Sequence, residues 1–453
     1  MKHIKASRSK SFVLVSMALV VCTMLPSSVF AGNSDAVLLG DTAAMTGGAV
    51  TAGIGDGTAL WYNPAGIAEA KQHQVDVSGS VYTLRNYSIG SVLQTVQGQN
   101  KGASIAEVIS VPSALTYVRK ISENVNLAFG LFVPSANDFS LRAVLQQDQS
   151  GASGQGLISV GLTSAAYFGG AGLGWKLSDK LRIGAGLYMS YRSENGSVHF
   201  GLGVKNDAID LAISTSSLLS NQYMGLEAGV GVQWDFARRW TLGLSVRSPG
   251  MLFLQSLRDT RLTAGGVIVG SDAVTQFEPE ETNSFEFASG IVSPTRIRMG
   301  LAYQIDGGWL SVDGDIQHGL KNDELSINNR FVWNLRAGGK LALSEHFSFG
   351  LGVFTDRSSD PEVREFADSK IDFYGLATAI QYRNKYALAE EEDSSDMTFS
   401  TTIGLRYAYG SGDFGSFVFD PSTFGTGADD PLSEKSNFTV HELGIHLGSA
   451  FYF

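Results

Sequence analysis

Charged side chains recur within segments in which apolar and polar residues alternate. They share the polar face of these segments with glycine and other small residues, and they are Arg182, Arg192, Glu227, Arg298, Arg336, Lys340, Arg406 and Glu442. In an enclosed space, opposite charges must pair with one another. A guanidinium group can instead bind a carboxylate through two parallel hydrogen bonds. These residues therefore predict either an ion-pair network or a site where one or two arginines hold the carboxylate of a ligand.

The sequence contains no recognisable catalytic or metal-binding set. The histidines are scattered, and no Ser, His and Asp residues occur in a context such as Gly-x-Ser-x-Gly between a strand and a helix. His441 and His446 are five residues apart, so on a strand they would point to opposite faces and could not share a metal. We therefore expect a protein that is not an enzyme and that needs neither a metal nor a cofactor.

The N-terminus has the features of a secretory signal peptide. Basic residues within 2–10 precede an apolar stretch at 12–25, and small residues precede a cleavage site after Ala31. A lipoprotein signal ending at Cys22 is the alternative, but Val21 is bulky where a small residue is required. Export of the chain with cleavage after Ala31 is the prediction.

Removal of this leader would change the composition in two ways. The only cysteine of the chain is lost with it, so the mature protein can form no internal disulfide. Four basic residues leave as well, so the net charge falls from -11 to about -15. An acidic protein lacks the basic surface that nucleic acid requires, and we expect no such partner.

Alternation with a period of two dominates the rest of the chain. In 183–191, Ile183, Leu187 and Met189 lie on one face, and Gly184 and Gly186 lie on the other. The same pattern occurs in 167–177, 224–234, 297–303 and 403–409. Apolar residues facing lipid and small or polar residues facing a lumen are typical of a transmembrane β-barrel. A soluble sandwich would place Thr, Lys and Glu on its polar face in place of repeated glycine.

The connections between these segments alternate in length. Short polar turns are predicted at 121–124, 177–180, 236–239, 306–308 and 343–346, with a longer one at 387–396. Long polar loops are predicted at 89–110, 135–157, 197–221, 249–293, 320–329, 358–369 and 411–437. Outer-membrane barrels have short periplasmic turns and long external loops, so this pattern predicts fourteen antiparallel strands. Because 249–293 could contain another hairpin, twelve and sixteen strands remain alternatives.

The last predicted strand ends at the C-terminus itself. Leu443, Ile445, Leu447, Phe451 and Phe453 share one face. A barrel must pair its last strand with its first, because an open sheet edge is not tolerated in lipid. A final Phe resembles the assembly signal of bacterial outer-membrane proteins, which implies the barrel assembly machinery as a partner of Phe453.

The stretch 53–66 precedes all of these strands and has neither a helix nor a strand pattern. It combines several glycines with Asn63-Pro64-Ala65-Gly66, and Pro64 forces Asn63 out of the helical region. We interpret it as a compact plug inside the barrel, which lumen charges could tether through Asp41 and Asp56. An ordinary connecting loop is the alternative.

The run from Gly40 to Gly66 resembles the N-terminal hatch of FadL-type long-chain fatty acid transporters, and Asn63-Pro64-Ala65 matches the hatch motif position by position. The segment ending at Pro134 is similar to a family strand that is kinked beside an opening in the barrel wall. The resemblance covers about 32–135 and the architecture. It implies a signal peptide (1–31), a hatch (32–72) and an outer-membrane barrel (73–453).

The same resemblance implies passive uptake of hydrophobic molecules, such as long-chain fatty acids or aromatic hydrocarbons, with release of the ligand sideways into the membrane. We expect a monomer surrounded by outer-membrane lipid. Two other functions stay open. The barrel could assist the secretion or anchoring of surface proteins, or it could be an outer-membrane enzyme that acts on lipids.

Overall fold

The computed structural model describes residues 33, 37–95, 98–149, 152–206, 209–269, 272–322, 327–364, 366–386, 397–419 and 433–453. The predicted signal peptide, its cleavage site at Ala31 and the predicted turn at 387–396 lie outside the described residues. No helix within the described residues is long and apolar enough to cross a membrane.

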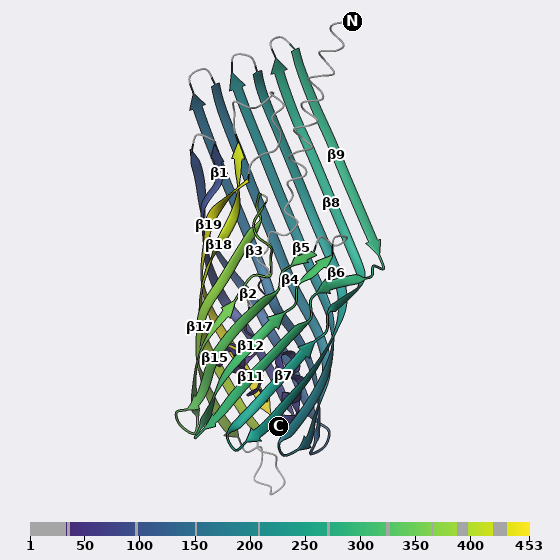
Figure 1. Ribbon diagram of the computed structural model, residues 1–453, viewed down its shortest axis with the longest axis vertical. Helices are drawn as coiled ribbons and strands as arrows, with labels where there is room; N and C mark the ends of the chain where they lie inside the picture. Colours follow the sequence, from purple (N-terminus) through teal and green to yellow (C-terminus); the bar gives the residue numbers. More distant parts are fainter. Residues whose placement is uncertain are drawn as a thin grey trace.

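One antiparallel sheet forms the wall of the molecule and closes on itself (Figure 1). Its first half contains β1 (Gln74–Thr95), β2 (Asn100–Lys120), β3 (Val125–Gln149), β4 (Ala152–Ser178), β5 (Leu181–Asn206) and β6 (Ile209–Ala237). Its second half contains β12 (Gly308–Gln317), β15 (Val332–Ala342), β16 (Phe347–Asp356), β17 (Ser369–Tyr386), β18 (Met397–Phe419) and β19 (Ser433–Tyr452). β19 pairs with β1 along most of its length, so the barrel has no open edge in lipid.

Two interrupted strands join these halves. β7 (Trp240–Arg247) and β8 (Gly250–Val269) both pair with β6, one after the other. β9 (Asp272–Glu286) and β10 (Gly290–Ser293) pair with β8, and β11 (Arg296–Ile305) pairs with β7. The breaks contain Pro249 and Pro294, which cannot donate to a ladder. Segment 249–293 is therefore a hairpin that continues two barrel strands, and among the described residues the ring has the fourteen crossings that the sequence predicted.

The predicted short turns lie together at one end of the barrel, whereas the predicted long loops are largely strand. Segments 89–110, 135–157 and 197–221 mostly lie within β1 to β6, and β13 (Leu320–Asn322) and β14 (Ile327–Asn329) form a small hairpin near the opposite rim. β4, β5 and β6 have 27, 26 and 29 residues, although a bilayer needs only about 10. The sheet therefore extends far beyond the barrel on this side (Figure 1).

The polarity of the two faces reverses where the sheet leaves the barrel. In the lower half of β5, Leu187 and Met189 are exposed on the outer face. In the upper half, Phe200 and Leu202 are buried on the inner face, and Lys205 is exposed on the outer face. The alternation continues without a shift, but the outer solvent changes from lipid to water. The loop prediction failed here because apolar residues that face inward do not match the pattern of a membrane strand.

An aromatic core holds the two sides of this extension together. The rings of Phe200 on β5 and Phe417 on β18 have centroids 5.1 Å apart, and those of Tyr87 on β1 and Phe139 on β3 are 5.3 Å apart. These residues belong to one buried apolar cluster. The inner face of the extension is therefore apolar and buried at this level.

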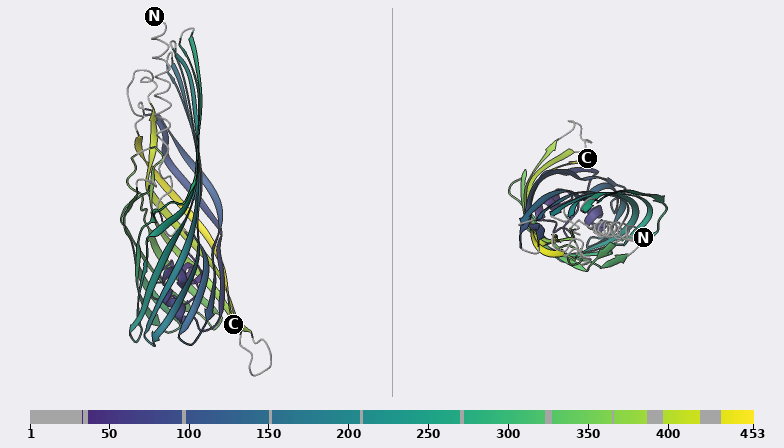
Figure 2. Two further views of the ribbon diagram at one scale, coloured as in Figure 1. Left: turned by 90° about the vertical axis from the view of Figure 1, so that its right-hand side faces the viewer. Right: turned by 90° about the horizontal axis from the view of Figure 1, so that it is seen from above.

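The N-terminal segment lies inside the lower part of the barrel (Figure 2). It contains α2 (Asp41–Thr46), α3 (Ala59–Tyr62) and the 3-10 helix η1 (Pro64–Glu69). Its apolar side chains, including Leu60 and Ile67, form a second buried cluster with inward residues of the wall. The predicted plug is thus confirmed, and the connecting loop is not what the structure shows.

Candidate functional site

Asn63 joins the plug to the wall. It is fully buried, and its Nδ2 donates to the carbonyl oxygens of Thr51, at 2.7 Å, and of Val232 on β6, at 3.1 Å. Its Oδ1 accepts from the amide of Ala65 at 3.2 Å and caps η1, which Pro64 begins. Pro64, Ala65 and Gly66 are buried beside it. The hatch motif predicted from the sequence therefore lies within the barrel. There the Asn63 side chain forms hydrogen bonds with backbone groups of both the plug and the wall.

Glycines line the wall opposite the plug. A Cβ at Gly231 would overlap Asn63, and one at Gly243 or Gly300 would overlap Thr51 or Ala52. The same holds where other plug atoms approach Gly172 and Gly174 of β4, Gly184 of β5, Gly338 of β15, and Gly350 and Gly352 of β16. The plug fits because these positions have no side chain. This is the crowded lumen that the repeated glycines predicted.

Three inward polar residues that we did not single out in the sequence also hold the plug. Asp313 on β12 accepts from the amides of Val50, at 2.7 Å, and Thr51, at 2.6 Å. Asn126 on β3 donates to two plug carbonyl groups, both at 2.9 Å, and Gln233 on β6 donates to another at 3.1 Å. Alternation places such residues in the lumen, but nothing local to them indicates a partner in the N-terminal segment.

Arg182 is the predicted lumen charge that contacts the plug through an ion pair. It pairs with Glu69 at the end of η1 and with Asp235 of β6 at 2.9 Å. This contact fits the tethering role proposed for the lumen arginines.

The predicted anchors Asp41 and Asp56 behave differently from one another. Asp41 accepts from Thr402 Oγ1 at 2.8 Å and lies 3.2 Å from His446 Nε2 on β19. Asp56 bonds to Thr42 and Thr58, both within the plug. Asp41 therefore reaches the wall through a hydroxyl and an imidazole, and Asp56 orders the plug itself.

Glu442 on β19 lies between two arginines. It accepts from Arg85 Nε at 2.6 Å and pairs with Arg406. Directly beside this group is a cavity of about 70 Å³. Its apolar lining comes from the extension and consists of Tyr87, Phe139, Ile371, Phe373, Phe414 and Phe438. The cavity therefore has an aromatic upper part and a charged base.

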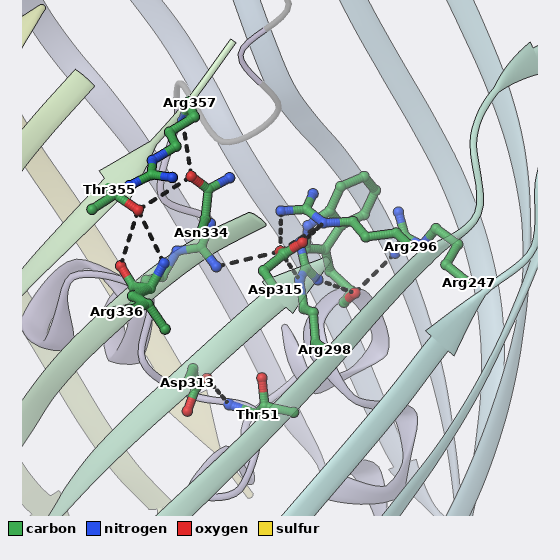
Figure 3. Close-up of polar contacts among 12 residues, drawn as sticks. Thr51, Arg247, Arg296, Arg298, Asp313, Asp315, Asn334, Arg336, Thr355 and Arg357 are labelled. Atoms are coloured by element: carbon green, nitrogen blue, oxygen red, sulfur yellow. Dashed lines mark hydrogen bonds and ion pairs between the residues drawn. The ribbon is translucent and has the colours of Figure 1, made fainter. Parts of the chain in front are cut away.

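Arg298 and Arg336 converge on a single carboxylate (Figure 3). Asp315 of β12 accepts from Arg298 Nε at 3.1 Å, from Arg336 Nη1 at 3.3 Å and from Arg296 Nε at 2.7 Å. Asp315 is almost fully buried. Three guanidinium groups thus share one carboxylate just above the plug.

Arg192 and Glu227 make looser contacts. Arg192 Nη2 and Glu227 Oε1 are 3.9 Å apart, and Arg247 Nη1 is 3.9 Å from Glu227 Oε2. Glu227 also accepts from Ser293 Oγ at 2.8 Å. Seven of the eight charged residues predicted as lumen groups therefore have an ionic partner in the described residues. The eighth, Lys340, donates to Gln381 Oε1 at 2.6 Å and lines the lower cavity.

Trp61 forms the upper surface of the plug. Its ring centroid lies 5.4 Å from that of Phe132 and 5.0 Å from that of Phe168. The guanidinium of Arg247 lies 3.8 Å from the Trp61 ring, and its Nη2 donates to the Trp61 carbonyl oxygen at 2.8 Å. Arg298 Nη1 reaches the same oxygen at 3.3 Å. Cations of the wall thus cover an aromatic surface of the plug.

Cavities lie on both sides of the plug. The upper one, of about 320 Å³, is lined by Trp61, Phe168, Arg192 and Arg247. The lower one, of about 530 Å³, is lined by Asp56, Trp309, Lys340, Arg383 and Tyr452. The plug lies between them.

Pro134 lies within β3 and not at its end. The β2–β3 ladder stops at Ala114↔Phe132, and the β3–β4 register shifts between Phe132 and Ser135. Beyond this point β2 pairs with β1, and β3 pairs with β4. The carbonyl oxygen of Pro134 instead accepts from the amide of Val37 in the plug, at 3.2 Å. Pro134 therefore marks the start of a seam in the wall between β2 and β3.

The described residues contain no group of three or more His, Cys, Asp or Glu side chains that could hold a metal ion. His441 contacts Tyr407 on the outer face, whereas His446 is buried beside Asp41. At the C-terminus, the amide of Phe453 donates to the His73 carbonyl oxygen at 3.0 Å. Its role as an assembly signal stays a prediction.

No protein-family model and no curated protein matches the sequence. Solved structures do match. A Pseudomonas aeruginosa FadL homologue aligns with a TM-score of 0.59 at 13% identity over 93% of this chain and 99% of that one. The Pseudomonas putida toluene transporter TodX aligns with a TM-score of 0.56 at 12% identity over 93% and 99%. The CymD monoaromatic hydrocarbon channel aligns with a TM-score of 0.51 at 11% identity over 92% and 97%. These likenesses show the fold: the chain is a plugged β-barrel similar to that of the FadL homologue and of TodX.

Proposed function

We propose that the protein takes up hydrophobic small molecules across the outer membrane without an energy source. The observation that carries this proposal is the aromatic cavity beside Arg85, Glu442 and Arg406, on the side of the plug that faces the extension. Burial of an apolar ligand there would contribute about 0.8 kcal/mol for each CH₂ group. A solved structure with this fold is described as a toluene transporter, which agrees with an apolar cargo.

The plug supports this proposal because it fills the lumen with packed residues. Leu60 and Ile67 are fully buried between plug and wall. A polar solute would find no open water path at this level, whereas an apolar ligand can gain free energy from burial at each step. The uptake of hydrophobic compounds is therefore compatible with a barrel that retains polar solutes.

The seam at Pro134 supports release of the ligand sideways. β2 and β3 lose their ladder above Ala114 and Phe132. A side-chain contact bridges them there, in which Glu107 Oε1 accepts from the Ser140 amide at 3.1 Å. Separation of the two strands at this point breaks little pairing, because backbone bonds between them are already missing. We infer that the ligand leaves through this seam into the lipid.

An uptake assay tests the proposal. Cells that lack an endogenous carrier would express the protein, and the entry of radiolabelled toluene and of a long-chain fatty acid would be followed. We expect faster entry of at least one ligand than in cells with an empty vector. Ile371→Phe, which fills the aromatic cavity, should reduce this entry, and Leu187→Phe on the lipid face should not.

Two results would contradict uptake. One is entry no faster than in control cells although the barrel is folded in the membrane. The other is the absence of any hydrophobic compound in lipid extracts of several purified preparations, combined with co-purification of a surface protein. The second result would instead favour the secretion or anchoring function.

A further inference from the structure

Arg357, on the outer surface of the barrel, has a side chain without an acceptor in the described part of the chain. It directly follows β16, and its guanidinium lies 3.8 Å from the ring of Trp333 on β15. Its Nε is buried without a hydrogen-bond partner, and the side chain forms no ion pair among the described residues. A guanidinium has five N–H donors and no acceptor. The donors of Arg357 therefore need an acceptor from outside the protein.

The position of Arg357 is fixed by its neighbours. Its backbone amide donates to Asn334 Oδ1 at 2.8 Å (Figure 3). Side chains alternate between the two faces of a strand. Arg357 therefore follows Val353, which is exposed on the lipid-facing side, whereas Asp356 is buried on the inner side. The stacked Trp333 ring is also exposed on the outer side. The guanidinium thus lies outside the barrel wall.

The level of Arg357 is the upper border of the lipid-facing band. On β15, the exposed residue Leu335 is followed by exposed Trp333 in the direction of the extension. On β17, Leu376 is followed by Tyr374 in the same way. Aromatic residues mark the interfaces of a membrane barrel, and long cationic side chains beside them reach the headgroups. Arg357 is therefore placed at the level of the lipid headgroups.

Arg330 adds a second positive charge at this place. Its backbone amide and its Nε donate to the carbonyl oxygens of Ser359 and Ser358, at 2.6 and 3.1 Å. Its Nη2 is 3.7 Å from Asp372 Oδ1, which is beyond hydrogen-bond distance. That oxygen already accepts from the Ser358 amide at 3.0 Å. Two guanidinium groups therefore lie near one carboxylate, which can neutralise only one of them.

We propose that Arg357 and Arg330 bind a phosphate group carried by a lipid of the outer leaflet. Guanidinium groups bind phosphate through two parallel hydrogen bonds, and stacking on an aromatic ring such as Trp333 holds the donors in a fixed orientation. The lipid chains would lie against the apolar band that includes Leu335. Inorganic phosphate offers the same oxygens but gains nothing from this band. The inference takes the outer-membrane location from the proposed function and does not depend on uptake.

Lipid A and its dephosphorylated form are a matched pair of probes, because they share their acyl chains and differ in the phosphate groups. Native mass spectrometry of the purified and delipidated protein would follow one-to-one adducts as each lipid is added. We expect lipid A to bind about tenfold more tightly, as charged hydrogen bonds provide. Arg357→Met keeps an apolar stem beside Trp333 and removes the charge. It should weaken lipid A binding about tenfold and leave binding of the dephosphorylated form unchanged.

The control is Arg258→Met. Arg258 is an exposed arginine of β8 in the extension, where it pairs with Glu281 at 3.1 Å. Its replacement should leave lipid A binding unchanged. Arg357→Lys keeps the charge but removes the two-pronged donor, so it should bind lipid A more weakly than the unmodified protein and more tightly than Arg357→Met. Circular dichroism would show that each variant is folded.

Three results would overturn the inference. The first is equal affinity for lipid A and its dephosphorylated form, and the second is unchanged lipid A binding in Arg357→Met. The third is displacement of lipid A by inorganic phosphate at equal concentration, which would identify a site for a free anion. Each of these results leaves the proposed uptake intact, since the cell assay decides that question separately.

Discussion

Asn63 of the plug and Gly231 of β6 lie so close that no side chain fits between them. The Asn63 amide donates to the carbonyl oxygen of the next residue, Val232, at 3.1 Å. A Cβ at Gly231 would overlap the Asn63 side chain. The hatch motif and the glycine-rich wall are therefore two halves of one contact, although 168 positions separate them in the sequence.

Gly231→Val should displace the plug. The added side chain occupies the position of Asn63, and overpacking at such a site costs about 1–3 kcal/mol. We expect cells with this variant to become permeable to a hydrophilic antibiotic that the outer membrane normally excludes. Growth inhibition by that antibiotic measures the permeability of the outer membrane. Gly314→Val is the control, because a Cβ at Gly314 meets its nearest atom only at 4.0 Å. Equal antibiotic sensitivity in the two variants would show that this contact does not hold the plug.

Glu442→Gln should destabilise the barrel. Glu442 is the shared partner of Arg85 and Arg406, and all three side chains are largely removed from solvent. The loss of one partner of a buried ion pair costs about 3–5 kcal/mol, because the remaining charges stay buried. Thermal unfolding followed by circular dichroism should show a lower Tm.

The control for this variant is Asp179→Asn. It removes the exposed pair between Lys176 and Asp179, whose atoms are 2.8 Å apart. Pairs in water contribute little, so the Tm should stay close to that of the unmodified protein. If both variants have the same Tm, the buried ion pairs of Glu442 contribute no more to the stability of the barrel than the exposed pair does.

Pro134→Ala should slow the release of ligand. Alanine keeps the carbonyl group that accepts from Val37 but adds an amide N–H, with which β3 can extend its ladder. We expect slower uptake of hydrophobic ligand with unchanged equilibrium binding. Pro249→Ala, at the break between β7 and β8, is the control and should not affect uptake. Normal uptake kinetics in Pro134→Ala would argue against the seam as an exit.

Much of the barrel could be predicted from the sequence because the determining property is local. Each outward residue of a crossing, such as Leu187 or Met189, must suit lipid, and its neighbours must suit the lumen. Alternation therefore identifies strands and faces one segment at a time. The same reasoning failed in the extension, where Phe200 and Leu202 face inward because water lies outside. A reversal of polarity along a continuous strand looks like a loop when lipid is assumed throughout.

The sequence by itself determined the membrane strands, the glycine-rich interior and the identity of the plug, since each depends on a short pattern. Only the tertiary structure decided which wall residues hold the plug. Asp313 reaches the amides of Val50 and Thr51 across more than 260 positions. Such pairings depend on strand register and on where the plug settles, and both follow from closure of the whole barrel. No local pattern contains that information.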